Sequence, residues 1–254
     1  MSRRRVVITG IGAVTPIGTT NDGLWEGIRR ERSAVGSVTR FDPSPFRSHN
    51  AAEVNDFVPT DHLEHKRAKR LDRFGQFSVA SARMALEDSG IDLAAEDRER
   101  IGTMMGTALG GVAYGEEQYF SFLQRGLRGV DPLLALTVFG GASSCNIAIE
   151  FGTFGPNSTN SMSCASGTIA LGDAFRQVRD GYADVMIAGG AEAPLIHHDR
   201  RAELAALAGR HATGTILKIY EAQVDAQRVL ARNANPRFTA ERMLLRMRDA
   251  VHGG

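Results

Sequence analysis

The stretch that decides the fold is "NSTNSMSCASGTIALGDAFRQVRDGYADVMIAGGAEAP", residues 157–194. Its first part, residues 157–163, is short and polar and fits a strand. Residues 167–181 then place apolar side chains at helical spacing, and residues 183–194 form a strongly apolar run that fits another strand. A strand, a helix and a strand in this order predict an α/β layer fold.

The preceding sequence repeats this alternation. Two buried strands are predicted, one in the β-branched run Val6–Thr9 and one in "RIGTMMGTALGG", which enters a glycine-rich loop. Residues 41–65 contain three prolines and no steady period, so they are predicted to form a long loop. Three helices are predicted, and they lie in residues 21–30, residues 69–90 and the second half of residues 131–152.

Length and composition indicate the class of protein. The chain has 254 residues, 43% hydrophobic and 23% charged, which fits a globular protein with a sizeable core. Its two cysteines cannot form a disulfide framework, and neither lies in the close Cys/His spacing of a metal site. No run approaches the about 20 apolar residues of a membrane span, and the N-terminal run is interrupted by Thr9 and two glycines. We therefore expect a cytoplasmic protein without a metal or a membrane anchor.

Two glycine-rich motifs resemble phosphate-binding loops but lack essential residues. "GIGAVT" has Thr15 where a dinucleotide-binding turn needs its third glycine, and Pro16 interrupts the helix that should follow. "GTALGG", residues 106–111, lacks the Lys-Ser/Thr ending of a phosphate loop. We interpret the first as a tight turn after a strand and the second as a close approach of backbone to a ligand or a neighbouring element.

Cys164 lies between the predicted strand and the predicted helix. The first turn of a helix stabilises a thiolate, because its backbone N–H groups are unpaired and the helix dipole favours negative charge. Small residues beside Cys164 would leave its approach open and would allow the tight elbow of a strand-to-helix nucleophile. The spacing alone leaves a buried structural cysteine equally open. Cys145, on a predicted packed helix, is interpreted as structural.

The order of these segments resembles the N-terminal half of a β-ketoacyl-acyl-carrier-protein synthase. The resemblance covers about residues 4–195. It rests on "RVVITGIGAVTPIG", "RLDRFGQFSVASARMALEDSG", "IGTMMGTALGG" and the Cys164 segment, in that order. One departure is Ala108, where the relatives carry a glycine.

The resemblance implies a thiolase-like layered α/β/α fold and a homodimer, or a pair with a related synthase subunit. It implies that Cys164 is the catalytic residue, which takes the acyl chain as a thioester. The acyl groups would arrive on the phosphopantetheine of acyl carrier protein, so no metal or other cofactor is expected. Condensation with malonyl-carrier would extend the chain in fatty-acid or polyketide synthesis. Nucleic acid is not an expected partner.

The family's second half supplies two active-site histidines, a lysine and an oxyanion donor, and no such motif follows residue 195. We interpret "HATGT" at His211, and the pair His197 and His198, as unrelated to those histidines. The chain is therefore expected to be a truncated member. A catalytically incompetent product, a non-catalytic dimer partner and, less favoured, a nucleotide-binding domain stay open as alternatives.

The composition changes near residue 200. Residues 1–199 hold 20 Lys and Arg against 24 Asp and Glu, a net −4, whereas residues 200–254 hold 10 against 5, a net +5. Glycine falls from 24 residues in the first part to 4 in the second. These shifts predict a synthase domain over residues 1–195, a junction over residues 196–210 and a basic helical tail of unrelated origin over residues 211–254.

Overall fold

The computed structural model describes residues 4–31 and 33–191. The chain divides into two compact units, residues 1–196 and residues 197–254, and the description below concerns the first. The predicted junction and tail, with His197, His198 and His211, lie outside the described residues.

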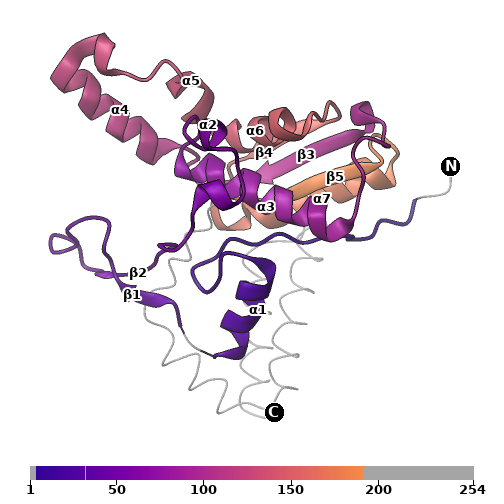
Figure 1. The fold of residues 1–254 in the computed structure, drawn as a ribbon, viewed down its shortest axis with the longest axis horizontal. Helices are drawn as coiled ribbons and strands as arrows, with labels where there is room; N and C mark the ends of the chain where they lie inside the picture. Colours follow the sequence, from indigo (N-terminus) through magenta and orange to yellow (C-terminus); the bar gives the residue numbers. More distant parts are fainter. Residues whose placement is uncertain (1–3, 32, 192–254) are drawn as a thin grey trace, which may run out of the picture. The chain divides into compact units, whose positions relative to one another are not determined.

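A three-stranded parallel sheet forms the centre of this unit (Figure 1). Its middle strand is β3 (Ile101–Gly106), which is buried along its whole length. On one side β3 pairs with β4 (Asn157–Asn160) and on the other with β5 (Val185–Gly190), both in parallel. Because the strands are parallel, their carboxyl ends all meet at one edge of the sheet.

Helices cover both faces of the sheet, as the alternation of side chains along β3 requires. Met105 packs into a core shared with helices α3 (Arg73–Ser89) and α6 (Ala142–Phe151). Its neighbour Met104 points the other way and packs against α7 (Ser166–Arg179). The result is a layered α/β/α arrangement, in agreement with the predicted fold class.

Local sequence explains where α3 begins and ends. Asp72 is its N-cap and accepts a hydrogen bond from the backbone N of Gly75 at 2.9 Å. Gly90 ends the helix in the left-handed region at φ +65°, which favours glycine. Between these residues the helix buries Phe74 and Val79 in the core, so the predicted helix over residues 69–90 is confirmed apart from its first turn.

A helical excursion joins β3 to α6. Helix α4 (Val112–Arg125) leads away from the sheet, and the chain returns through the 3-10 turn η3 (Gly126–Gly129) and the short helix α5 (Leu134–Thr137) (Figure 1). The predictions did not include α4. Several large apolar side chains on this excursion are exposed, including Phe120 and Leu127.

The predicted strand at Val6–Thr9 is wrong. These residues belong to no helix or strand and pair with no strand among those described, and Ile8 is 81% exposed. The cause is the packing of the following glycines, because a Cβ on Gly10 would lie 2.1 Å from the carbonyl oxygen of Ala85 in α3. The backbone N of Ile11 also donates to Asp88 at 2.8 Å. The segment therefore lies along α3, and its glycines serve this close approach rather than a turn after a strand.

Smaller elements complete the described unit. Helix α1 (Asn21–Arg29) is capped by Thr20, whose side chain accepts a hydrogen bond from the backbone N of Gly23 at 3.0 Å. The predicted loop over residues 41–65 contains short regular pieces. The remaining elements are β1 (Val35–Ser37), β2 (Asn50–Ala52), η1 (Pro59–Asp61), α2 (His65–Ala68), η2 (Arg98–Arg100) and η4 (Ser163–Ala165). None of the helices in the described ranges has the length and apolarity needed to cross a membrane.

Candidate functional site

Cys164 lies in the short turn η4, between the end of β4 and the first residue of α7. Its side chain is exposed, so the interpretation as a buried structural cysteine does not fit this position. The neighbouring amide of Ala165 donates to the carbonyl oxygen of Met162 at 3.2 Å. Among residues 4–31 and 33–191, no backbone acceptor is bonded to the amide of Cys164 itself.

The residue before the cysteine has an unusual backbone conformation. Ser163 has φ +51°, in the left-handed region that non-glycine residues seldom adopt. Such conformations store backbone strain, and they cluster at functional sites. Here the left-handed residue turns the chain sharply between β4 and α7, which is the elbow expected for a strand-to-helix nucleophile.

Glycines allow α7 to begin directly on the ends of the strands. A Cβ on Gly106, the last residue of β3, would lie 2.3 Å from the carbonyl oxygen of Ser166. A Cβ on Gly167 would lie 3.3 Å from the backbone of Gly190, the last residue of β5. The first turn of α7, and with it Cys164, is therefore held at the carboxyl edge of the sheet. Open α/β sheets bind their ligands at this edge.

The loop after β3 borders the same turn. A Cβ on Gly140 would lie 3.1 Å from Ser161 Oγ and 3.6 Å from Thr107 Cγ2. Residues from three segments therefore meet beside residues 161–165, the cysteine turn. Within this loop Gly110 adopts φ +61°, and its amide donates to Thr107 Oγ1 at 3.0 Å. The backbone of "GTALGG" thus passes close to neighbouring elements. A close approach to a neighbouring element was one of the two interpretations of this motif, and an approach to a ligand was the other.

Asn160, the last residue of β4, has three side-chain hydrogen bonds around the cysteine turn, and sequence reasoning did not single it out. The available signal was a carboxamide at the end of a strand, four residues before the candidate nucleophile. Cys145 lies elsewhere, on α6, and is only partly accessible. The sequence interpretation of Cys145 as structural fits this position.

The described histidines belong to other regions of the fold. His49 lies beside β2 and hydrogen-bonds to the carbonyl oxygen of Phe46 at 2.8 Å. His62 stacks on Phe57 with ring centroids 5.7 Å apart, and His65 begins α2. In residues 4–31 and 33–191, no group of three His, Cys, Asp or Glu side chains is arranged to hold a metal ion.

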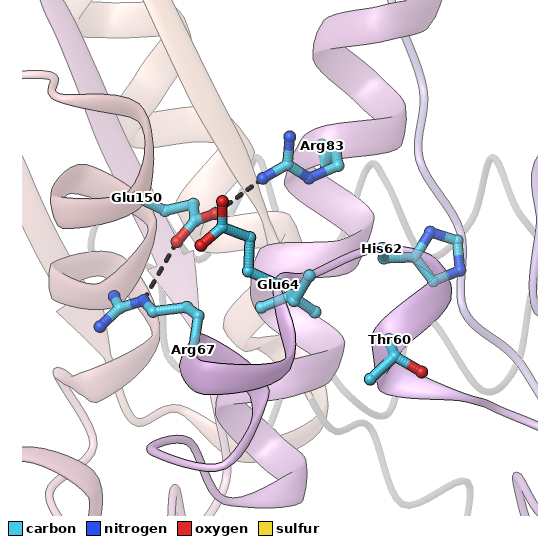
Figure 2. Close-up of a pocket in the computed structure, with 7 residues that line it drawn as sticks. Thr60, His62, Glu64, Arg67, Arg83 and Glu150 are labelled. Carbon is cyan, nitrogen blue, oxygen red and sulfur yellow. Dashed lines mark hydrogen bonds and ion pairs between the residues drawn. The ribbon is translucent and has the colours of Figure 1, made fainter.

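A hollow of about 520 Å³ lies against α2, α3 and α6 (Figure 2). Glu150 sits between two arginines there, accepting from Arg67 at 3.0 Å and from Arg83 at 2.7 Å. The two guanidinium groups are thus neutralised by a carboxylate within the fold, and we interpret the cluster as a structural link between three helices. The lining residues are Thr60, His62, Leu63, Glu64, Arg67, Arg83 and Glu150, and they do not include the cysteine turn.

Two polar groups near the start of α4 have shifted pKa values. Burial raises the pKa of Asp72, and the nearby charge of Glu117 adds to this effect. Burial also raises the pKa of Tyr114 to about 12, together with the hydrogen bond that its hydroxyl donates to Asp131 at 2.6 Å. Tyr114 is therefore a neutral hydrogen-bond donor that fixes the start of α4 to the chain before α5.

Comparison with known proteins agrees with this arrangement. The family model "Beta-ketoacyl synthase, N-terminal domain" matches residues 3–222, a range that extends past the predicted domain end at residue 195. A 3-oxoacyl-[acyl-carrier-protein] synthase 2 from Synechocystis sp. is 38% identical over 195 residues, which are 77% of this chain and 47% of the relative. The enzyme of the same name from Staphylococcus aureus (strain COL) is 36% identical over 194 residues, 76% of this chain and 47% of the relative. The chain spans about half the length of these curated relatives.

Solved ketosynthase structures share the fold. The ishigamide ketosynthase/chain length factor matches with a TM-score of 0.67 and 31% identity, over 84% of this chain and 52% of the other. A type II PKS acyl-carrier protein in complex with its ketosynthase matches with a TM-score of 0.64 and 25% identity, over 76% of this chain and 54% of the other. The expected thiolase-like layered fold is thereby confirmed. The chain belongs to the β-ketoacyl synthase family, whose N-terminal domain it carries.

Proposed function

We propose that this chain provides the acyl-accepting cysteine of a carbon-carbon bond-forming acyltransferase, a β-ketoacyl-acyl-carrier-protein synthase. The observation that carries the proposal is the exposed Cys164 on a sharp turn at the carboxyl edge of the sheet. Membership of the family and the likeness to ketosynthase structures support it.

In the first step, the Cys164 thiolate attacks the carbonyl carbon of an acyl group carried as a thioester on acyl carrier protein. The sulfur–carbon bond to Cys164 forms, the bond between the acyl carbon and the carrier's phosphopantetheine sulfur breaks, that sulfur leaves as a thiolate, and the acyl chain is held as an enzyme thioester. The turn before α7 leaves the sulfur exposed, so an incoming thioester can reach it. We assign the amide of Cys164, which has no backbone acceptor among the described residues, to the developing oxyanion.

In the second step, a malonyl group on the carrier loses CO₂, and its carbanion attacks the thioester. The new carbon–carbon bond forms, the bond to Cys164 sulfur breaks, and the thiolate is regenerated. Negative charge on the malonyl thioester must be stabilised by donors in a dry site. The described histidines lie beside β2, directly after η1 and at the start of α2, so we assign this role to no described residue.

Acyl carrier protein and a second synthase subunit are the partners that this function requires. One matched structure is described as an acyl-carrier protein in complex with its ketosynthase, and another as a ketosynthase/chain length factor. We extend both kinds of partner to this chain, as a homodimer or a pair with a related subunit. We also propose a cytoplasmic location. We propose in addition that the reaction uses no metal or nucleotide, because thioester cleavage and loss of the malonyl carboxylate supply its driving force.

Mass spectrometry of the intact chain after incubation with acyl-carrier thioester tests the proposal. We expect one acyl adduct, mapped to Cys164, which is absent in Cys164→Ala and retained in Cys145→Ala. Adding malonyl-carrier should give no steady turnover by the 254-residue chain alone. An unmodified chain would contradict the proposal and favour a non-catalytic dimer partner. Steady turnover that depends on Cys164 would instead show that the donors for decarboxylation lie within this chain.

A further inference from the structure

We propose that Asn160 is a positioning residue, whose carboxamide ties the Cys164 turn to the end of β3 and to the first residue of α7. The effect of Asn160 on acyl transfer rests on the proposed function. The geometry itself is independent of that function.

The side chain and the backbone oxygen of Asn160 are all hydrogen-bonded at this junction. Its Nδ2 donates to the carbonyl oxygen of Ser166 at 3.0 Å and, in a longer bond, to that of Met105 at 3.4 Å. Its Oδ1 accepts from the backbone N of Met162 at 3.2 Å. Its backbone oxygen accepts from the amide of Thr107 at 2.9 Å. One residue thus bonds to β3, to the loop after β3, to the turn and to α7.

The cysteine turn needs such an anchor because burial does not hold it. Residues 161–165 are all exposed, and the chain between the last residue of β4 and the first of α7 includes the left-handed Ser163. A strained backbone persists only where surrounding bonds over-determine it. Asn160 bonds to the turn just before Ser163 and to the helix just after Cys164, so it fixes the span between these points.

The same bonds set the direction of the Cys164 amide. If the turn relaxed, the thiolate and this amide would lose their shared orientation toward a thioester carbonyl, even with the sheet intact. Small displacements of reacting groups are costly, since about 1 Å of misplacement can cost roughly a hundredfold in rate. Asn160 therefore acts through Cys164 and need not touch the substrate.

Asn160→Leu removes the hydrogen bonds while keeping a similar volume. The matched control is Asn157→Leu, because Asn157 begins the same strand and also donates to a backbone carbonyl, that of Ser144 at 3.1 Å. Two rates are measured: acylation of Cys164 by a small acyl thioester of N-acetylcysteamine, and alkylation of Cys164 by iodoacetamide relative to Cys145. We expect Asn160→Leu to lower both rates at Cys164 by about tenfold or more. In Asn157→Leu both rates at Cys164 should equal those of wild type. The alkylation rate at Cys145 should be the same in wild type and in both variants.

Asn160→Asp gives a readout that a purely structural role would not. At neutral pH its carboxylate would face the carbonyl oxygens of Met105 and Ser166, and the repulsion should displace the turn. Protonation restores one donor, so its acylation rate relative to wild type at the same pH should recover as the pH falls from about 7 to about 5. If Asn160→Leu does not fold, the pH series of Asn160→Asp tests the proposal instead. If the acylation rate of Asn160→Asp relative to wild type does not change with pH, the proposal is overturned.

The outcomes separate this proposal from the proposed function. Wild-type rates of acylation and alkylation in Asn160→Leu would overturn the positioning role and leave the acyltransferase function standing. A wild-type chain that is never acylated, combined with slower alkylation in Asn160→Leu, would overturn the function and leave the positioning role standing.

Discussion

Gly167 in the first turn of α7 and Gly190 at the end of β5 face each other so closely that a side chain on either crowds the other. A Cβ on Gly167 would lie 3.3 Å from the Cα of Gly190, and a Cβ on Gly190 would lie 3.2 Å from the Cα of Gly167. This pair sets how deeply the helix start is seated on the sheet, three residues beyond the cysteine.

The first prediction concerns Gly167→Val. The branched side chain should push the start of α7 away from β5, with a loss of about 1–3 kcal/mol in the free energy of unfolding and slower acylation of Cys164. Gly172→Val is the control, because Gly172 lies in the same helix and, among the described residues, a Cβ there would meet only the end of Arg176, at 3.8 Å. Chemical denaturation of both variants checks the difference. Equal stabilities would show that the helix start is not tightly seated.

The second prediction is that Cys164 reacts with iodoacetamide before Cys145 does. Cys164 is exposed at the start of a helix, whereas Cys145 is partly covered within α6. Limited labelling followed by peptide mapping measures the ratio, and urea-unfolded protein is the reference in which the difference should disappear. Preferential labelling of Cys145 in the folded chain would contradict the assignment of Cys164 as the reactive thiol.

The third prediction concerns pH and Asp72. Burial raises the pKa of this carboxyl in the folded state, so its ionisation favours unfolding, and stability from this group declines as pH rises through the folded-state pKa. Asn is an equally good N-cap and carries no charge. Asp72→Asn should therefore match wild type in acid and become relatively more stable toward neutral pH. Thermal melts from about pH 4 to about pH 7 measure this. If the stability of Asp72→Asn relative to wild type fell as the pH rose, the raised pKa of Asp72 would be contradicted.

The fourth prediction concerns Glu150, which links Arg67 and Arg83. Glu150→Gln should destabilise the fold by about 1–3 kcal/mol, because two partly buried guanidinium groups lose their shared carboxylate. Glu64→Gln is the control on the same hollow, where the carboxylate is exposed and the change should stay within about 0.5 kcal/mol. If both variants lost the same stability, the central role of Glu150 would be refuted.

The parts of the fold that local patterns encode were predicted correctly. Helix α7, strand β5 and the seat of Cys164 between strand and helix follow from periodicity and from the small residues around the cysteine. These features depend on neighbours within a few residues along the chain, which a sequence displays directly.

Features that depend on distant partners were not predicted. The run Val6–Thr9 has the composition of a strand, but the two glycines after it allow the chain to lie along α3, about 75 residues away. Helix α4 was missed because its exposed apolar residues do not form the single buried face that marks a helix in a sequence. The bonds of Asn160 were missed because their partners come from β3, the turn and α7 together.

The position of β3 in the middle of the sheet also affects the order of events during synthesis. Its last residue, Gly106, pairs with Asn160 of β4 and with Gly190 of β5, and Gly190 lies 84 positions after Gly106 in the chain. At about 5–20 residues per second, a ribosome needs roughly 4–17 s to make that stretch. Strand β3, the most buried of the described strands, therefore leaves the ribosome well before β5 has been made. Non-local pairing of this kind folds slowly and leaves an apolar strand open to aggregation in the meantime.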